Sequence, residues 1–217
     1  MKNVTIIGAS HGIGAAVTAA FHARGDQVTA VARNPGGLND LAARHPGIAT
    51  LAGDATDPAV ASTLLRDLPD IVVLAAGAPA ANTPFHQLDW DTFSQNWQGD
   101  TRMAFNLLKA AVLQPMKPGA VVIVISSGAA INGSPISGGY GGAKRMQLFL
   151  AGYAQKEAQR AGRDTRFFAL APAEIMAQTE FGLAAAQAYG VYNGTTTERF
   201  LGGAGFTSEA DLGSTLA

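Results

Sequence analysis

The stretch GASHGIG, residues 8–14, follows directly on a short run of apolar β-forming residues, Val4–Ile7. Glycine loses more backbone entropy on folding than any other residue, so three glycines in seven positions indicate a backbone that turns tightly or approaches another group closely. Gly8 suits the turn, and Gly12 and Gly14 suit the close approach at the start of a helix. Because N–H groups at a helix start bind anions, the stretch predicts a pyrophosphate site, with a turn needed only for packing as the alternative.

Strands and helices alternate along the rest of the chain. Short β-rich runs end in small or polar residues, and breakers such as Pro35-Gly36-Gly37 separate the elements. This alternation predicts an α/β fold: a Rossmann-like, doubly wound parallel sheet of six or seven strands with helices on both faces, in one domain over residues 1–217. The expected strands are Val4–Ile7, Gln27–Ala32, Ile48–Ala52, Ile71–Ala75, Val121–Ser126 and Arg166–Leu170, and the longer helices Ala15–Arg24, Pro58–Arg66, Asp91–Leu113 and Gly142–Arg160.

Composition excludes several classes of function. The 217 residues include no cysteine, so neither a disulfide framework nor a thiolate metal site or nucleophile is expected. The formal net charge of −1 does not suggest a general nucleic-acid or anionic-membrane surface. No apolar run approaches the ~20 residues that span a bilayer. We therefore expect a soluble cytoplasmic protein with a small-molecule partner and no metal, nucleic acid or membrane partner.

Arg33 bears on the choice of nucleotide. In NAD-binding sheets an acidic residue about 20 positions after the glycine loop accepts a hydrogen bond from the ribose 2′-OH. Here that neighbourhood holds Ala32 and then Arg33, so no carboxylate repels a 2′-phosphate, and a guanidinium can bind one bidentately. His11 in the glycine loop could add a further donor. NADP is therefore favoured over NAD, with a solvated arginine and a histidine that only fits the turn as the alternatives.

Tyr140 and Lys144 are four residues apart at the start of a helical pattern, so their side chains share one helix face. A free phenol has a pKa of about 10 and exchanges its proton poorly at neutral pH, whereas a cation within about 4–6 Å stabilises the phenolate. Ser127 follows the fifth expected strand, where a hydroxyl can hold a substrate oxygen. The pattern indicates proton transfer, and the alternative is a core tyrosine beside a solvated lysine.

The order of these motifs resembles the short-chain dehydrogenase/reductase family over nearly the whole chain. GASHGIG is similar to the family's T-G-x-x-x-G-I-G loop, and Ser127 lies thirteen residues before Tyr140, as the family's catalytic serine does. Asn96 in NWQG resembles the asparagine of the family's long interface helix. The resemblance implies that Tyr140 is the general acid, that Lys144 assists it and holds the nicotinamide ribose, that Ser127 orients the carbonyl, and that Asn96 holds a water in a proton relay.

The same resemblance assigns cofactor contacts. Asp54 and its neighbour Ala55 match the position that touches adenine, and Ile175 matches the position where the backbone meets the nicotinamide carboxamide. The implied activity is that of an NADPH-dependent carbonyl reductase, reversible as an alcohol dehydrogenase. The candidate cofactor-binding residues are Gly8, Ser10, His11, Gly12, Ile13, Gly14, Arg33, Asp54, Ala55, Ala76, Gly77, Tyr140, Lys144, Pro172 and Ile175.

Some positions depart from the family pattern. The family's N-N-A-G reads Leu74-Ala75-Ala76-Gly77, and its Pro-Gly reads Pro172-Ala173. Tyr140 is flanked by Gly138-Gly139 and Gly141-Gly142, a loose setting for a catalytic helix start. The family's last strand is absent after FTSEADLGSTLA, so either the sheet has six strands or the sequence given is shorter than the natural product. These departures keep open an NADP-binding sensor or regulator without useful turnover.

Two surfaces complete the expectations. Residues 173–203 would form a lid over the nicotinamide, rich in aromatic residues and poor in charge, which favours an apolar or aromatic ketone, aldehyde or secondary alcohol; simple packing of those aromatics is the alternative. The helices that carry Asn96 and Lys144 are apolar over a broader arc than one sheet contact needs. We therefore expect a homodimer or homotetramer, with a helix face covered by loops within one subunit as the alternative.

Overall fold

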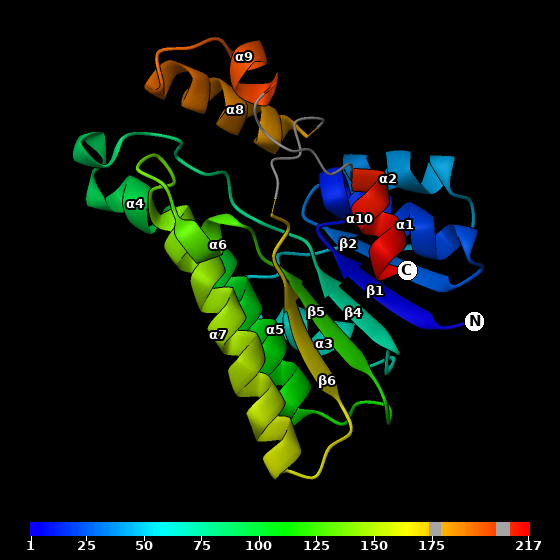
Figure 1. Cartoon of the computed structure of the whole chain (residues 1–217). Helices are drawn as coiled ribbons and strands as arrows, with labels where there is room; N and C mark the ends of the chain where they lie inside the picture. The colour runs from blue at the N-terminus through cyan, green and yellow to red at the C-terminus, as the bar shows by residue number, and fades with distance from the viewer. Residues whose placement is uncertain (174–178, 203–208) are drawn as a thin grey trace.

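The computed structural model describes residues 1–173, 179–202 and 209–217. Within them, six parallel strands form one sheet in the order β3-β2-β1-β4-β5-β6, and no seventh strand is present in this part of the chain. The predicted six-stranded doubly wound sheet is confirmed (Figure 1). The strands are β1 Asn3–Ile7, β2 Gln27–Ala32, β3 Ala49–Ala52, β4 Ile71–Leu74, β5 Val121–Ile125 and β6 Arg166–Leu170.

The central strands are buried on both faces, as their continuous apolar runs predict. Because successive side chains of a strand point to opposite faces, Ile6 packs into one hydrophobic core and Ile7 into the other. One core lies under α1 and α2, with Phe21 and Leu41 fully buried in it. The other lies under α3, α5 and α7, where Leu107 is fully buried. The edge strands β3 and β6 are more exposed.

The helices cover both faces of the sheet. α1, α2 and α10 lie on one side and α3, α5 and α7 on the other, while α8 and α9 lie beyond the carboxyl ends of the strands (Figure 1). The helices are α1 Gly12–Ala23, α2 Pro35–Arg44, α3 Pro58–Leu64, α4 Trp90–Asn96, α5 Arg102–Leu113, α6 Ala129–Asn132, α7 Gly139–Arg160, α8 Glu180–Tyr192, α9 Thr197–Gly202 and α10 Glu209–Leu216, with a 3₁₀ turn η1 Phe85–Gln87 and a π-helical segment η2 Trp97–Thr101.

One local prediction was wrong and one was incomplete. Pro35-Gly36-Gly37 is the first turn of α2 and not a break, because the side chain of Asn34 accepts a hydrogen bond from Gly36 N (2.9 Å) and proline is favoured at the first helical position. The helix expected over residues 91–113 is helical throughout, but Trp97–Thr101 within it form the π-helical segment η2 between α4 and α5. A π-helical turn inserts extra backbone and changes which residues face a neighbouring helix, so the helical period of the sequence does not reveal it.

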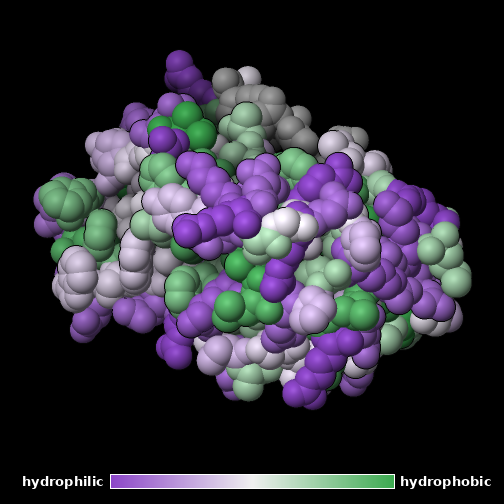
Figure 2. All heavy atoms as spheres, turned by 90° about the horizontal axis from the view of Figure 1, so that it is seen from below, coloured by the Kyte–Doolittle hydropathy of each residue, from purple (hydrophilic) through white to green (hydrophobic). Residues whose placement is uncertain are grey.

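The amino ends of the strands form the edge opposite the carboxyl ends. There Asp70 Oδ2 accepts a hydrogen bond from Asn3 N (2.7 Å) and pairs with Lys117 Nζ at 3.0 Å. The Asn3 N–H, and then the Lys117 ammonium, hold the pKa of Asp70 below its ordinary value despite partial desolvation. Figure 2, seen from below in Figure 1, shows this edge with hydrophilic residues around small hydrophobic areas.

The described helices do not include one with the length and apolar character of a membrane span. In the same part of the chain, no group of three or more His, Asp or Glu side chains is arranged to hold a metal ion.

Candidate active site

The glycine turn after β1 brings three strand ends together. Gly8 N and Ala9 N both donate hydrogen bonds to Val31 O of β2, at 2.8 and 3.1 Å, and Ala75 N after β4 donates to Ile7 O at 2.8 Å. Gly8 has a φ of +86°, and a Cβ there would overlap the backbone of Ala76. Glycine is therefore required here by conformation and by contact, which explains the first position of GASHGIG.

The start of α1 is open to a ligand. His11, directly before the helix, has an extended backbone, and its side chain makes no capping hydrogen bond. The imidazole Nδ1 lies 2.9 Å from Ser10 Oγ at the surface. A Cβ on Gly12, whose φ is +58°, would meet nothing within 4 Å. Free helix N–H groups and open space fit an anionic group such as a pyrophosphate, as the sequence predicts.

Arg33 and Asp54 follow the ends of β2 and β3, and both are exposed. Asp54 Oδ1 accepts hydrogen bonds from Thr56 N and Thr56 Oγ1, each 2.9 Å. The Thr56 N–H is the main cause that lowers the pKa of Asp54, and the positive charges of Arg33 and Arg102 act in the same direction. Arg33 makes no salt bridge within the described residues. Its charge acts on Asp54 only at a distance, and the guanidinium is exposed.

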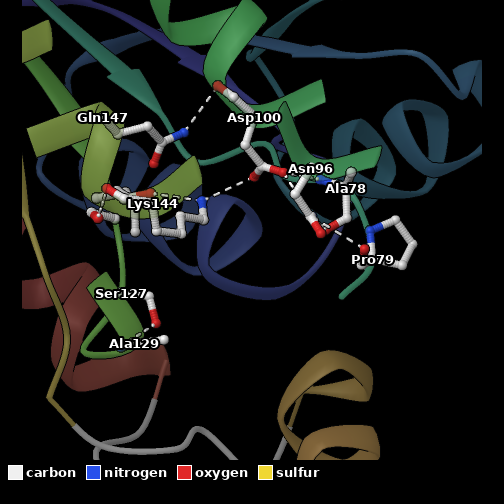
Figure 3. A network of polar contacts seen from close by, with 10 residues as sticks. Ala78, Pro79, Asn96, Asp100, Ser127, Ala129, Lys144 and Gln147 are labelled. Carbon is white, nitrogen blue, oxygen red and sulfur yellow. Dashed lines mark hydrogen bonds and ion pairs between the residues drawn. The ribbon is translucent and has the colours of Figure 1, made fainter. Parts of the chain in front are cut away.

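The carboxyl end of β5 is tied directly to α7. Ser126 Oγ donates to Lys144 O (2.8 Å), and Lys144 Nζ donates to Ile125 O (3.2 Å). Ser127 Oγ accepts a hydrogen bond from Ala129 N (3.2 Å), which leaves its own O–H to donate to a substrate oxygen. Figure 3 shows the side chains of Ser127 and Lys144 in the same close-up view.

Tyr140 lies in the first turn of α7. Its ring centre is 5.6 Å from Lys144 Nζ, within the range of a cation–π contact, so the two side chains share a face as their spacing predicts. On α8, Phe181 packs against the same ring with centroids 5.0 Å apart. The Tyr140 ring thus contacts both a cation and an aromatic residue from the region expected to form the lid.

Asn96 has more protein partners than the sequence indicates. Its Nδ2 lies within hydrogen-bond distance of Ala78 O (3.1 Å), Pro79 O (3.2 Å) and Asp100 Oδ2 (3.0 Å), and the side chain is buried (Figure 3). The side-chain amide therefore anchors the loop after β4.

Asp100 and Gln147 were missed by the sequence analysis. Asp100 lies in η2, and its Oδ1 is 3.2 Å from Lys144 Nζ. Gln147, one turn after Lys144 on α7, donates from Nε2 to Asp100 O (3.2 Å). The sequence offers one signal for Asp100, its i, i+4 spacing from Asn96. Polar pairs at this spacing are also common on exposed helix surfaces, so only the burial of the two side chains identifies them as part of the site.

The remaining candidates lie around these groups. Ala76 and Gly77 follow β4, and a Cβ on Gly77 would lie 2.9 Å from Asp100 Oδ1 and 3.7 Å from Lys144 Nζ. Pro172 O accepts a hydrogen bond from Gly128 N (2.7 Å), which holds the chain after β6 against the chain after β5. Ala55 is buried next to Asp54. Ile175 lies outside the described residues.

The glycines around Tyr140 are packed, contrary to the loose setting expected from the sequence. α7 begins at Gly139, and a Cβ there would overlap the carbonyl of Phe93 on α4. A Cβ on Gly141 would come within 3.1 Å of Ala129 O and Ser137 Oγ. Only Gly142 has open space around it. The glycine run thus lets α4 and α6 approach the helix start that carries Tyr140.

The fold and the site together define a class of protein. Its members have a nucleotide-binding α/β sheet with a tyrosine, a lysine and a serine at the carboxyl edge. The family model described as short chain dehydrogenase matches residues 2–186 of the chain. The protein belongs to the short-chain dehydrogenase/reductase family.

Several solved structures share the fold. The sorbitol-6-phosphate 2-dehydrogenase of Erwinia amylovora has a TM-score of 0.85 at 20% identity, over 99% of this chain and 90% of its own. A short-chain dehydrogenase from Streptomyces avermitilis has a TM-score of 0.78 at 20% identity, over 99% and 82%. A short-chain dehydrogenase/reductase from Brucella melitensis has a TM-score of 0.70 at 22% identity, over 90% and 92%. Comparison with curated proteins finds no match.

Gly139→Ala should lower the free energy of unfolding by about 2 kcal/mol, because the new methyl group must displace the Phe93 carbonyl. Gly142→Ala, three residues further along α7, should leave stability unchanged or raise it by up to about 1 kcal/mol, since its Cβ meets no neighbour. Urea unfolding of both variants tests this difference, and equal effects would contradict the packed description of the glycine run.

Proposed function

We propose that the protein is an NADPH-dependent carbonyl reductase, which also runs in reverse as an alcohol dehydrogenase. Membership of the short-chain dehydrogenase/reductase family supports an oxidoreductase that uses a nicotinamide cofactor, NAD or NADP. The observation that carries the proposal is the contact of Lys144 Nζ with the Tyr140 ring, 5.6 Å from its centre, beside the strand that ends in Ser127.

The residues present fit a dinucleotide. The uncapped start of α1 and the open space at Gly12 suit the pyrophosphate. Asp54 and Ala55 would contact the adenosine, and Arg33 would bind a 2′-phosphate. Lys144 would hold the nicotinamide ribose through N–H groups that its bond to Ile125 O leaves free. When bound, the nicotinamide supplies the hydride that reduces the carbonyl carbon.

The side chains of this chain would handle the proton and the oxygen. Ser127 donates its free O–H to the substrate carbonyl oxygen and fixes its orientation. Tyr140 donates its phenolic proton to the same oxygen as negative charge develops there. Lys144 stabilises the resulting phenolate, because an adjacent cation favours the ionised form of an acid. Asn96 completes the proposed proton relay through a water, while its amide holds the loop after β4.

The substrate would be an apolar or aromatic ketone, aldehyde or secondary alcohol. Phe181 supports this proposal because it packs directly on Tyr140. Tyr189 and Phe200 pack against each other, with ring centroids 5.2 Å apart. These two aromatic residues therefore pack within the lid region itself. The lid would comprise residues 173–203 of a single domain spanning 1–217, with α8 and α9 beyond the carboxyl edge of the sheet (Figure 1).

A sensor or regulator that binds NADP without useful turnover is the second candidate. Oxidation of NADPH with a panel of apolar and aromatic carbonyl compounds distinguishes the two. Turnover with any of them supports the reductase, whereas tight NADPH binding with no turnover across the panel supports the sensor.

The unmutated protein should bind NADPH more tightly than NADH. Arg33→Ala should weaken NADPH by about one to two decades, because a charge-assisted phosphate contact contributes about 1.5–3 kcal/mol, and should leave NADH almost unchanged. Cofactor fluorescence titration measures both constants. Arg66→Ala, another exposed arginine after α3, is the control and should alter neither. Equal affinities for the two cofactors in the unmutated protein would contradict NADP preference.

Tyr140→Phe should lower turnover by about 100-fold or more, because only the proton-donating hydroxyl is lost. Binding of NADPH should stay nearly intact. Lys144→Ala should damage both turnover and binding, since Lys144 also holds the ribose. Tyr153→Phe, on the exposed surface of the same helix, removes a hydroxyl away from the site and should be neutral. Normal turnover of Tyr140→Phe would refute the mechanism.

We further propose that the protein is a homodimer or a higher homo-oligomer through α5 and α7. Large aromatic residues on these helices and on η2 are about half exposed: Trp97, Phe105, Phe149 and Tyr153. A hollow of about 360 Å³ runs between the helices, lined by Trp97, Gln98, Thr101, Arg102, Phe105, Met146 and Leu150. A second copy related by a two-fold axis would cover this surface.

Sedimentation at micromolar concentration should give at least twice the 22.2 kDa mass of one chain. Phe105→Glu should shift the protein toward monomer, because a charge would be buried in the interface. Phe85→Glu, on the exposed η1 turn away from these helices, should leave the assembly unchanged. A clean monomer of the unmutated protein would contradict the proposal.

A further inference from the structure

Asp100 is a buried ionisable residue that the mechanism above does not use. Its relative exposure is 0%, that of Lys144 is 5%, and Asp100 Oδ1 lies 3.2 Å from Lys144 Nζ. Removing two charges from water is unfavourable unless their geometry is fixed and their remaining hydrogen-bonding groups are satisfied. The contacts of Asp100 therefore indicate whether the pair has a defined arrangement.

Three segments hold the Asp100 carboxylate and backbone in place. Oδ2 accepts hydrogen bonds from Asn96 Nδ2 (3.0 Å) and from Ala78 N (3.2 Å) in the loop after β4. The backbone carbonyl of Asp100 accepts from Gln147 Nε2 (3.2 Å) on α7 (Figure 3). The carboxylate is thus fixed between α4, the β4 loop and the helix that carries Lys144.

The contact of Asp100 with Lys144 is one of charge and not of a directed hydrogen bond. Oδ1 has no hydrogen-bond donor in good geometry among the described residues, although Nζ is only 3.2 Å away. Lys144 Nζ directs one N–H to Ile125 O, and an ammonium has three. The carboxylate therefore attracts the ammonium, and two of the three N–H groups are not used by Ile125 O.

Burial explains why Lys144 needs such a partner. A buried ammonium is unfavourable unless an opposite charge and fixed acceptors lie close to it. Lys144 also has a flexible four-carbon chain, whose direction toward the Tyr140 ring must be fixed by its neighbours. Within the described residues, Asp100 is the carboxylate that pairs with it.

We propose that Asp100 is a positioning residue that acts through Lys144, holding its ammonium in place and directed toward Tyr140 and the cofactor ribose. This inference rests on the proposed function, because it assigns Asp100 a part in the same site. Asp100 touches neither substrate nor cofactor in this arrangement, so its influence on turnover should exist only while Lys144 is present.

A double-mutant cycle tests this dependence, with Asp100→Asn, Lys144→Met and the variant with both changes. Each single change strands one buried charge and should shift the unfolding equilibrium in urea by about two to three decades toward the unfolded state. The double variant should regain most of that loss, because the pair is then replaced by uncharged groups of similar size. Additive losses of stability would overturn the pairing.

Turnover and NADPH binding distinguish the proposed role of Asp100 from a purely structural one. If Asp100 only stabilised the fold, its replacement would change neither quantity in the folded protein. Measured where all variants are folded, Asp100→Asn should lower turnover at least about tenfold in the unmutated background and by less than about twofold in the Lys144→Met background. NADPH affinity should show the same dependence. Equal losses in both backgrounds, or unchanged turnover and affinity in Asp100→Asn alone, would overturn the inference.

Asp70→Asn is the matched control, since Asp70 also pairs with a lysine, Lys117, but at the amino edge of the sheet. It should reduce stability and leave turnover and NADPH affinity within about twofold of the unmutated protein. If the unmutated protein reduces no carbonyl compound in the panel, the proposed function fails. The unfolding and NADPH-binding cycles then still decide whether Asp100 acts through Lys144.

Discussion

The buried ammonium of Lys144 is the constraint on which the rest of the candidate site depends. A charge with 5% exposure is tolerated only with an opposite charge and fixed acceptors nearby, and Asp100 and Ile125 O supply them. Asp100 lies in the π-helical segment η2 between α4 and α5 and from there reaches Lys144 on α7. The anchoring of the loop after β4 by Asn96 follows from the same arrangement.

The sequence predicted the sheet well because its signals are local. Runs such as Val121–Ile125 are apolar on both faces, and only a strand covered by helices on both sides buries such a run. α2 was missed because proline followed by two glycines was read as a break. The start signal was present in Asn34 as the capping residue and Pro35 at the first helical position, but capping depends on one hydrogen bond that composition alone does not reveal.

Part of the candidate site was also predictable, because its signals are local in the sequence. Tyr140 and Lys144 are neighbours on one helix, and Ser127 ends a strand, so their spacing carries the information. Asp100 lies 44 residues before Lys144 on a different helix, and a π-helical turn decides which way it faces. The packing of Gly139 against Phe93 is equally non-local. Long-range contacts of this kind arise from how helices pack, which no local pattern in a single sequence encodes.

The segment after β4 connects the two halves of the candidate site. Ala76 lies against Gly8 so closely that a Cβ on Gly8 would overlap it, and Gly77 lies beside both Asp100 and Lys144. At the junction of β4 and this segment, the N-N-A-G of the family pattern resembles Leu74-Ala75-Ala76-Gly77, which lacks both amides. Without those amides, the loop is anchored by the Asn96 amide and the Asp100 carboxylate, which bind the backbone of Ala78 and Pro79. The residue that neutralises Lys144 thus also fixes the loop against which the glycine turn packs. The Asp100 carboxylate thus contacts both the loop that packs on the glycine turn and the lysine beside Tyr140.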